Sequence, residues 1–579
     1  MRRGRVVGVV VLAVSAAGSG VSSNSLGASQ GSPAGLRYAR VRQVCPRPRP
    51  RHATCLALLL VSAPAGEAGV SPYTTAAGAA STGPAGGLTP ADLASAYGYS
   101  PASGGAGQTV AIVDAYDDPK IEQDLAAFDV HYGLGACTTA NGCFKKVGQT
   151  GSTTVLPAAD KVGWSVEIAL DVETVHGVCP SCAIVLVEAN SESFADLAAS
   201  VNEAVSVGAT EVSNSYGGLE TAFGASEQAA YDHPGVAIAA ASGDSGYLNW
   251  DYVAQFGAAP GQPDAPASLP TVVSVGGTSL KLTTSGTRAR ETVWNDSGRP
   301  SHEAEFKQFS ASGGGCSTLF TAPAWQQSVA GWTKAACATK RLDNDISAVA
   351  DPYTGFDIYD TYLYEPKFVG GWQTVGGTSL SSPLVSGLYG LAGGGHGASY
   401  PAATLYAHVG QASTLFDVSK GGDGYCDGEE PAACGEPAVN ELLGNVDCEG
   451  TTSCDAALGF DGPSGVGAPK GLGAFATSTQ SKPTVVTGTA GSLEATAAVL
   501  NATVNPNGTA VTACTFEYGL TTSYGSSAPC SPPPGAGTSP VAVSAAVSGL
   551  TAKTTYHFRA VATNALGTGK GASKNFTTP

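Results

Sequence analysis

The chain has 579 residues, of which 43% are hydrophobic and 13% charged, so it is too long for one compact core and too poor in charge for a disordered polyelectrolyte. Its formal net charge of −17 disfavours a nucleic-acid partner. The 77 glycines and 35 prolines indicate frequent turns and exclude a helical bundle or a coiled coil. We therefore expect two or more folded units.

The amino terminus has the pattern of a secretory signal peptide, which we assign to residues 1–20. Arg2, Arg3 and Arg5 precede a mostly apolar run from Val6 to Ala17, and small residues follow. This run is too short to span a bilayer, and no later stretch reaches the roughly 18 apolar residues that a spanning helix needs. We expect a secreted, extracellular protein, a monomer with no stable membrane insertion.

The fourteen cysteines are an even number, and in an exported chain they indicate disulfides. A zinc site at Cys179 and Cys182 lacks a second ligand pair at suitable spacing. Sequence does not fix the connectivity, but neighbouring cysteines would close seven short loops: Cys45/Cys55, Cys137/Cys143, Cys179/Cys182, Cys316/Cys337, Cys426/Cys434, Cys448/Cys454 and Cys514/Cys530.

Residues 21–87 are rich in Ala, Ser, Gly and Pro, with a basic patch from Arg37 to Arg51, and we interpret them as a prosegment or spacer. From Gly107 onward, β-branched runs alternate with helical patterns, which predicts an α/β fold: a parallel sheet with helices on both faces. A long irregular stretch is expected from about 247 to 370. The predicted strands lie within 109–116, 182–189, 210–217 and 235–246, and the predicted helices within 164–177, 194–209 and 375–393.

The composition changes near Lys482. From there to Pro579 the chain is rich in Thr, Val, Ala and Ser, and alternating runs such as ACTFEYG and TYHFRAVATNA are separated by turn signals. This pattern predicts an all-β sandwich domain over 482–579. The tail resembles bacterial fibronectin type III modules.

One candidate nucleophile stands in the sequence Gly377-Thr-Ser-Leu-Ser-Ser-Pro383. A turn of small residues that places Ser379 at a helix amino terminus exposes its hydroxyl, and Pro383 in the first helical turn would cost no hydrogen bond. A serine at such a turn is also a common helix cap. Ser379 needs a base to act as a nucleophile.

Carboxylates are better candidates for that base than histidine. Only His176 lies near a strand–helix junction, so a triad of Ser379, His176 and Asp114 has weak support. Glu167 and Asp171 are four residues apart, which places both carboxylates on one helix face, where they would share a proton at mildly acidic pH. A third acid, Asp244, follows the apolar strand GVAIAAAS. Each could also be an ordinary solvated or turn residue.

Three motifs in order, Glu-x-x-x-Asp, Ser-Gly-Asp and Gly-Thr-Ser-x-Ser-x-Pro, resemble the sedolisin family of serine-carboxyl peptidases, which share the subtilisin fold. The resemblance covers residues 88–478 and extends to the segments at 88–98, 213–218, 312–326 and 343–355. It implies Ser379 as nucleophile, Glu167 as general base and then acid, Asp171 as its partner and Asp244 as the oxyanion-hole acid. A carboxylate base and a protonated Asp244 together imply an acidic working pH.

The resemblance also implies one structural Ca²⁺ ion, with Asp417, Val418, Ala457, Gly459 and Asp461 as its ligands. Ala457 stands where the family often has glycine, and ordinary acidic turns are the alternative. Family members usually carry a longer folded propeptide than the residues before 88 can form. A cysteine-rich acidic insertion over 419–456 could hold a second ion, shape substrate access, or be a surface loop.

We expect a secreted serine-carboxyl peptidase that hydrolyses peptide bonds in proteins at acidic pH through an acyl-enzyme, acting as an endopeptidase or an exopeptidase. The alternative is an inactive secreted binding protein that uses the peptidase scaffold and the fibronectin-like module. The four filled catalytic positions argue against that alternative.

Overall fold

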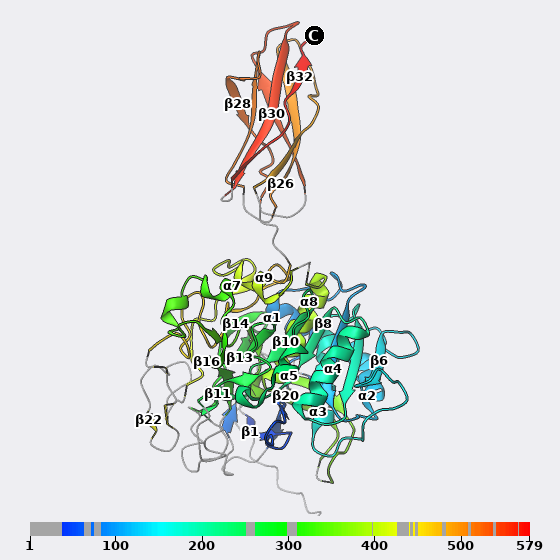
Figure 1. Cartoon of the computed structure of the whole chain (residues 1–579). Helices are drawn as coiled ribbons and strands as arrows, with labels where there is room; N and C mark the ends of the chain where they lie inside the picture. The colour runs from blue at the N-terminus through cyan, green and yellow to red at the C-terminus, as the bar shows by residue number, and fades with distance from the viewer. Residues whose placement is uncertain are drawn as a thin grey trace, which may run out of the picture.

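The computed structural model describes most of the chain (Figure 1). The described residues are 37–62, 71–73, 83–250, 261–297, 310–366, 368–395, 398–424, 439–440, 444–445, 448, 450–476, 482–507, 511–535, 540–564 and 567–579. The signal peptide assigned to residues 1–20 and the Cys426/Cys434 pair lie outside these residues.

A mostly parallel sheet forms the centre of the larger unit, as predicted. Its strand order is β14-β13-β10-β8-β5-β7-β6, and β18 also pairs with β13. Only β14 runs antiparallel to its neighbour in this sheet. The strands are β5 (Thr109–Ala115), β6 (Phe144–Gly148), β7 (Ala183–Ala189), β8 (Glu211–Asn214), β10 (Ala237–Ala241), β13 (Val273–Leu282), β14 (Arg288–Val293) and β18 (Ile346–Val349).

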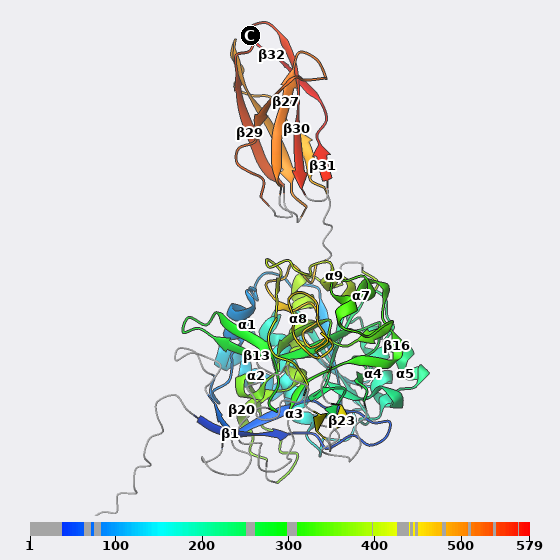
Figure 2. The ribbon, with the colours of Figure 1, turned by 90° about the vertical axis from the view of Figure 1, so that its left-hand side faces the viewer.

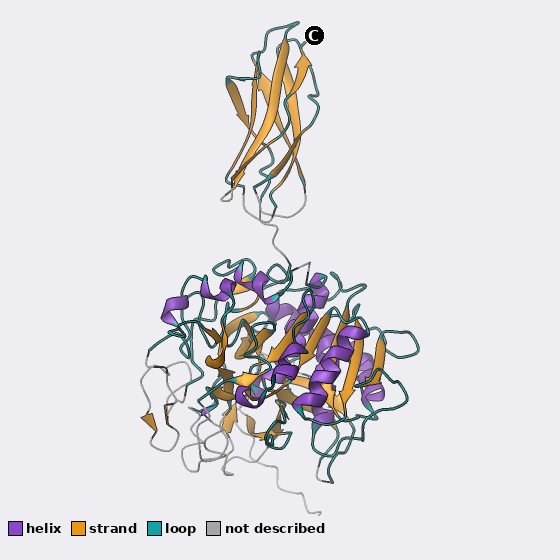
Figure 3. Ribbon diagram, viewed as in Figure 1, coloured by secondary structure: helices purple, strands orange, loops and turns teal. Residues whose placement is uncertain are grey.

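Helices cover both faces of this sheet (Figure 3). Helices α3 (Trp164–Val178) and α8 (Thr378–Ala392) pack against each other, and α4 (Phe194–Ser206) packs on β5 and β7. Gly387 permits the close approach of α8, because a Cβ there would lie 3.0 Å from the Val178 side chain. The other α-helices of the described residues are α1 (Pro90–Tyr97), α2 (Ile121–Tyr132), α5 (Ala225–Ala229), α7 (Ala324–Gln327) and α9 (Ala402–Tyr406).

Helix α3 is buried along its whole length, so its start must be fixed from within the protein. Gly163 precedes it in a left-handed conformation (φ 108°), which favours glycine. The Asp160 carboxylate accepts hydrogen bonds from the Gly163 and Ser165 amides, each at 3.0 Å. A carboxylate at this end satisfies free amides and suits the helix dipole. This start determines where the carboxylates of α3 point.

The expected irregular stretch from 247 to 370 is wrong in part, because it contributes β13 and β18 to the central sheet. Glycines at 276 and 277 weaken the strand signal of β13, but packing requires them: a Cβ on Gly277 would lie 2.7 Å from the Ala350 Cβ. Further short strands lie in the stretch: β12 (Asp264–Ala265), β15 (Ala311–Gly314), β16 (Cys316–Thr321), β17 (Lys340–Leu342) and β19 (Phe356–Asp360).

Residues 37–62, in the region interpreted as a prosegment or spacer, form strands on the larger unit. They are β1 (Arg37–Gln43), β2 (Thr54–Cys55) and β3 (Leu58–Ser62). Strand β3 pairs with β1 and with β20 (Gly371–Gly376), which leads into α8. In this sheet β3 lies between β20 and β1, and Figures 1 and 2 show β1, in dark blue, on the same side of the larger unit as β20. This segment therefore lies next to the turn that carries Ser379.

The carboxyl-terminal region is a two-sheet β sandwich, as predicted, with a separate hydrophobic core. Buried and exposed residues alternate along its long strands, so each sheet has one face on the core. One sheet contains β25 (Thr484–Thr487), β26 (Ala497–Asn505) and β29 (Val541–Ser548). The other contains β27 (Ala513–Gly519), β28 (Ser526–Pro529), β30 (Thr555–Asn564), β31 (Gly567–Lys570) and β32 (Lys574–Thr577).

Local disulfide pairing is confirmed for every predicted pair among the described residues, which leaves no free cysteine there. The bonds are Cys45–Cys55, Cys137–Cys143, Cys179–Cys182, Cys316–Cys337, Cys448–Cys454 and Cys514–Cys530. The Cys179–Cys182 bond rules out the zinc alternative at this pair. Within the same described ranges, no helix is both long and apolar enough to cross a membrane.

Candidate active site

The four residues singled out as catalytic lie together at the carboxyl ends of the central strands. Glu167 and Asp171 project from α3, Asp244 follows β10, and Ser379 is the second residue of α8. Glu167, Asp171 and Ser379 are fully buried, and Asp244 is 8% exposed. Helix α3 and the amino-terminal end of α8 thus face each other across one site, which is where parallel sheets place their chemistry.

Ser379 stands at the helix amino terminus, but Pro383 is not in the first turn as expected. Pro383 is the sixth residue of α8, where it cannot donate a hydrogen bond to the Ser379 carbonyl one turn earlier. The hydroxyl of Ser215 lies 3.3 Å from that carbonyl, and the same hydroxyl makes a shorter contact of 2.8 Å with Asp171 Oδ1. The proline therefore leaves an acceptor for Ser215, the residue that follows β8.

A third carboxyl group, Asp114 at the end of β5, joins the two on α3. Burial, with the nearby Asp114, raises the pKa of Glu167 well above its ordinary value. Burial, Asp114 and Glu167 together do the same for the pKa of Asp171. Burial also raises the pKa of Asp114, and neither of its carboxyl oxygens has a hydrogen-bond partner among the described residues. Three carboxyl groups this close together and fully buried cannot all be ionised at once, so they share protons.

Ser379 is close to Glu167 without a standard hydrogen bond between them. The Ser379 hydroxyl and the Ala57 amide both act on Glu167 to stabilise its ionised form, which moderates the rise in its pKa. Neither meets standard hydrogen-bond geometry, and within the described chain the Glu167 oxygens have no such partner. The Ser379 hydroxyl donates instead to the Ser215 carbonyl at 3.2 Å. A small rotation of Ser379 would direct its proton to Glu167.

Asp244 is held by the residue that precedes Ser379. Its Oδ1 accepts hydrogen bonds from the amide and the hydroxyl of Thr378, each at 2.8 Å. Burial raises the pKa of Asp244 to about 7. Its Oδ2 has no partner in the described chain and faces Gly377, where a Cβ would lie 2.7 Å away. A protonated Oδ2 can therefore donate a hydrogen bond into the site.

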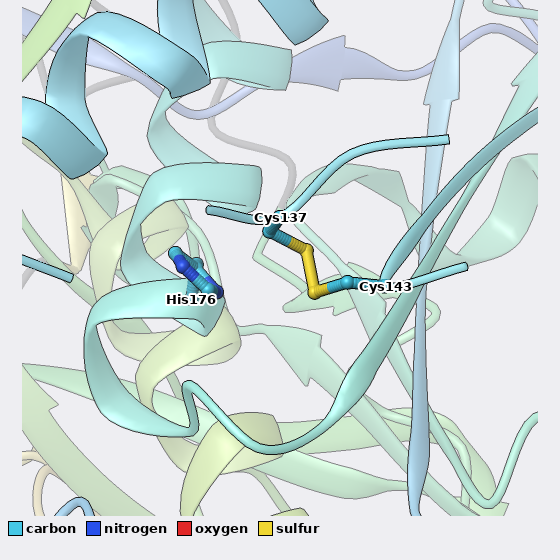
Figure 4. A group of neighbouring side chains, drawn as sticks. All are labelled: Cys137, Cys143 and His176. Carbon is cyan, nitrogen blue, oxygen red and sulfur yellow. A yellow bond between two sulfur atoms is a disulfide. The ribbon is translucent and has the colours of Figure 1, made fainter. Parts of the chain in front are cut away.

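The structure does not bring His176 to Ser379. The His176 ring pairs with Asp129 at 3.1 Å and contacts the Gly135 carbonyl at 2.9 Å. Figure 4 shows it beside the Cys137–Cys143 disulfide. Although these three side chains could be grouped as metal ligands, cysteines in a disulfide have no thiolate to offer. His176 is a buried structural histidine, and the histidine triad is wrong.

The chain's own residues 53–58 cover the candidate site, with the Leu56 carbonyl beside Gly377 and the Ala57 amide beside Glu167. These residues are buried, with exposures between 0% and 7%. Strand β2 pairs with β9 (Tyr216–Leu219), and β3 pairs with β20, so the segment runs across the candidate site from β9 to β20. Sequence reasoning missed this cover, although RYARVRQ and LALLLVS carry strand patterns. Only pairing with strands far along the chain locates it over the candidate site.

The predicted calcium ligands also come together. Asp417 accepts a hydrogen bond from the Gly459 amide at 3.2 Å, and Asp461 accepts one from the Ala457 amide at 2.8 Å. The Val418 carbonyl accepts from Ser464, which also bonds Asp461. Burial raises the pKa of Asp461 to about 8, and the nearby Asp417 adds to this rise. Among the described residues neither aspartate has a salt bridge, so a bound cation would fit this donor set.

Comparisons with known proteins identify the family of the chain. Residues 150–442, just over half of the chain, match the subtilase family. The chain is 30% identical over 373 residues to sedolisin of Pseudomonas sp. (strain 101), covering 61% of this chain and 58% of that protein. It is 29% identical over 315 residues to kumamolisin of Bacillus sp. (strain MN-32), covering 52% and 51%. The chain thus spans about half the length of the curated relatives it matches.

Among solved structures, one similar protein is Pseudomonas sedolisin, a serine-carboxyl proteinase, in complex with two molecules of pseudo-iodotyrostatin. The TM-score is 0.52 at 26% sequence identity, and the match covers 67% of this chain and 96% of that one. Glu167 and Asp171 on α3 and Ser379 at the start of α8 lie within residues 150–442, which match the subtilase family. The chain belongs to the subtilase family, and within it to the sedolisin type.

Proposed function

We propose that this protein is a serine-carboxyl peptidase that hydrolyses peptide bonds at acidic pH through an acyl-enzyme on Ser379. The observation that carries the proposal is the buried cluster of Ser379, Glu167, Asp171 and Asp244, while His176 contacts Asp129 and the Gly135 carbonyl instead of the serine. Protein or peptide chains are the substrates. Ser379 attacks the substrate carbonyl carbon, and Glu167 takes the hydroxyl proton and returns it to the leaving amine.

Asp171 keeps Glu167 in position to exchange that proton. The Asp171 Oδ1 lies 2.8 Å from the hydroxyl of Ser215, the residue that follows β8, and this contact holds the carboxyl group in place. The proton shared among Asp114, Glu167 and Asp171 lets one of them be neutral while another is ionised. This mechanism requires a pH at which Glu167 is ionised and can accept the Ser379 proton.

Asp244 donates the hydrogen bond that stabilises the oxyanion. An ionised carboxylate would repel the negative charge that develops on the carbonyl oxygen, so Asp244 must be protonated during turnover. Because burial raises its pKa to about 7, Asp244 keeps this proton at acidic pH. The upper pH limit of activity is then set by Asp244.

We expect kcat/KM on a denatured protein substrate to fall as pH rises through about 7, where the pKa of Asp244 lies. Asp244→Ala should lose about 10²- to 10³-fold in kcat, as when other oxyanion donors are removed. Asp244→Asn keeps a donor with no proton to lose, so it should retain more activity and carry it to higher pH. Sequencing the products across pH 3 to 8 gives both the rate and the bonds cleaved.

The matched control is Glu211→Gln, because Glu211 is another buried acid of raised pKa, but it accepts from Thr210 and is not among the groups that shift the pKa of Asp244. It should leave the alkaline limit unchanged. Equal losses in Asp244→Asn and Asp244→Ala, with an unshifted alkaline limit, would refute the donor role. Intact substrate at every pH would refute the peptidase proposal.

One Ca²⁺ ion belongs to the proposal, held by Asp417, Asp461 and the carbonyls of Val418, Ala457 and Gly459. Among the described residues no cationic side chain forms a salt bridge with these two aspartates, so the ion would supply the positive charge that balances them. At pH 6, calcium should raise the melting temperature relative to a chelator, because a ligand at 100 times its Kd adds about 2.7 kcal/mol to stability. Asp417→Asn keeps the shape and loses the charge, so its melting temperature should not respond. An equal calcium shift in both proteins would contradict the site, and magnesium is the ion control.

We also propose that the protein is secreted and acts outside the cell as a monomer. The basic and apolar amino terminus and the local disulfides support this. The carboxyl-terminal sandwich, which resembles a fibronectin type III module, has a core of its own and belongs to a separate unit. We place the domain boundaries at 88–478 and 482–579.

A further inference from the structure

The loop between α2 and β6 meets the end of α3 at a disulfide and a histidine. Cys137 and Cys143 close this loop with a bond that spans six positions, and His176 stands on α3 two residues before its end. One ring nitrogen of His176 lies within 4.8 Å of both sulfur atoms. Figure 4 shows the ring beside the sulfur–sulfur bond. Two sulfur atoms and an imidazole are therefore gathered at one point outside the candidate active site.

One carboxylate, that of Asp129 on α2, holds both sides of this group. Its Oδ1 pairs with His176 Nε2 at 3.1 Å, and its Oδ2 accepts a hydrogen bond from the Cys137 amide at 3.0 Å. The Gly135 carbonyl lies 2.9 Å from the same Nε2. His176 Nδ1, by contrast, is buried and has no hydrogen-bond partner in the described chain. Histidines that bind metals are oriented in this way, because a carboxylate or carbonyl accepts a hydrogen bond from one ring nitrogen and leaves the other for the ion.

Cys143 is the accessible end of the disulfide. Cys137 is fully buried, whereas Cys143 is partly exposed and lines a pocket of about 420 Å³ together with Gly135 and Cys182. A small thiolate that enters this pocket meets Cys143 first, and its attack there releases Cys137 as the leaving thiol. A second thiol then frees Cys143. Two molecules of the reductant leave as one disulfide, and both cysteines become thiols.

We propose that reduction of the Cys137–Cys143 bond by a small thiol creates a zinc site, with the two sulfur atoms and His176 Nδ1 as ligands. One Zn²⁺ ion replaces the two thiol protons, which pass to the solvent, and water from the pocket fills the fourth position. Zinc bonds of about 2.0 to 2.3 Å place tetrahedral ligands roughly 3.5 to 4 Å apart, so the sulfur atoms separate and the ring moves inward by about 1 Å. The disulfide ties the loop to itself, whereas the ion also ties it to α3, the helix of Glu167 and Asp171.

The Cys514–Cys530 pair of the sandwich is the internal control. Both cysteines are partly exposed, so a reductant and an alkylating reagent reach them. Within the described chain they belong to no group of three His, Cys, Asp or Glu side chains close enough to share an ion. Zinc sites in proteins take three or four protein ligands, and this pair offers two. Zinc should therefore leave its reactivity unchanged.

The test uses the full chain at about pH 7.5, where protons compete little with zinc for thiolates. The chain is reduced without denaturant by dithiothreitol, freed of reductant without oxygen, and alkylated with or without Zn²⁺. Peptide mass spectrometry gives the rate at each cysteine. Zinc at ten times its Kd should slow alkylation of Cys137 and Cys143 by about 10-fold, because only the unbound fraction reacts, and should not slow it at Cys514 and Cys530. Cobalt(II) as a second probe should give one equivalent of sulfur-to-metal charge-transfer absorption.

Three variants identify the ligands. His176→Gln keeps both thiols and removes the imidazole, so zinc should no longer protect Cys137 and Cys143. Asp129→Asn keeps the shape but not the charge that orients the ring, and zinc affinity should fall about 10- to 100-fold, as when outer partners of other metal sites are changed. His131→Gln is the matched control, because it makes the same substitution at an exposed histidine on α2 and should leave the protection unchanged.

Three results would overturn the inference. The first is zinc protection in His176→Gln equal to that in the wild type. The second is cobalt binding without the charge-transfer band in the reduced wild type, a result that does not depend on how any variant folds. The third is a Cys137–Cys143 bond that stays oxidised while Cys514–Cys530 is reduced. Because no step involves Ser379, none of these results bears on the proposed peptidase function.

Discussion

Replacing Ser379 with alanine should reduce turnover of a peptide substrate by about 10⁴- to 10⁶-fold, because the serine, its base and the oxyanion donor act as a unit. Glu167→Gln should cause a comparable loss, since the amide keeps the shape of the carboxyl group but cannot accept the serine proton. Both variants should fold, because neither Ser379 Oγ nor Glu167 holds a strong hydrogen bond in the described chain. Rates are measured at acidic pH on wild type and variants.

Two control variants make this result specific. Ser386→Ala on the same helix should keep wild-type rates. His176→Gln removes the side chain that a histidine triad would need; it loses the contact with Asp129 and should lower the melting temperature, but the remaining folded protein should turn over normally. A loss of turnover in His176→Gln as large as that in Ser379→Ala would restore the histidine as base and contradict the carboxylate mechanism.

The free energy of unfolding should be highest near pH 4 and fall as pH rises toward 8. Burial raises the pKa of Asp118 and Asp264 to about 7, of Glu211 and Asp360 to about 8, and of Glu188 to about 9. Between the ordinary carboxyl pKa near 4 and these values, the folded protein keeps protons that the unfolded chain has released. Stability therefore falls with rising pH, by roughly 1.4 kcal/mol per pH unit for each such group.

Denaturant titrations of Ser379→Ala protein at several pH values measure this dependence without self-digestion. Glu211→Gln keeps the shape of a buried acid that accepts a hydrogen bond from Thr210 at 2.6 Å, and it removes one titrating group. Its stability should fall less steeply between pH 5 and 8. Stability that increases from pH 4 to 7, as when carboxylates are held ionised by cations, would contradict this reading of the buried acids.

Much of the site could be predicted because its residues stand in local patterns. Glu167 and Asp171 are one helical turn apart, Asp244 follows an apolar strand, and Ser379 begins an apolar helix. Periodicity therefore indicated both the element and the end of it that each residue occupies. The calcium ligands, in contrast, were predicted only from the resemblance to the sedolisin family, because ordinary acidic turns have the same local pattern. Roles for these residues remain predictions that the experiments above decide.

The parts that could not be predicted depend on contacts between distant residues. Asp114 enters the site because β5 lies between β7 and β8, and nothing near it in sequence indicates Glu167 as a neighbour. Thr378 holds Asp244 across 134 positions of the chain. Strands β2 and β3 are short, and their place over the candidate site follows from pairing with β9 and β20. The strand β13 was missed because packing there requires glycines, which weaken the local signal.

The buried acids also change what the charge of this protein means. The formal value of −17 counts every aspartate and glutamate as ionised, and the sequence isoelectric point is about 4.8. Burial holds the pKa of Glu173, Asp343 and Asp423 well above the ordinary range, besides those of the site, so the folded molecule carries fewer negative charges than its formula near neutral pH. Its isoelectric point is therefore higher than the sequence value. Unfolding near neutral pH releases these protons into the solvent. The hydrogen ion is therefore a stabilising ligand of this fold that binds at many sites and dissociates as the pH rises.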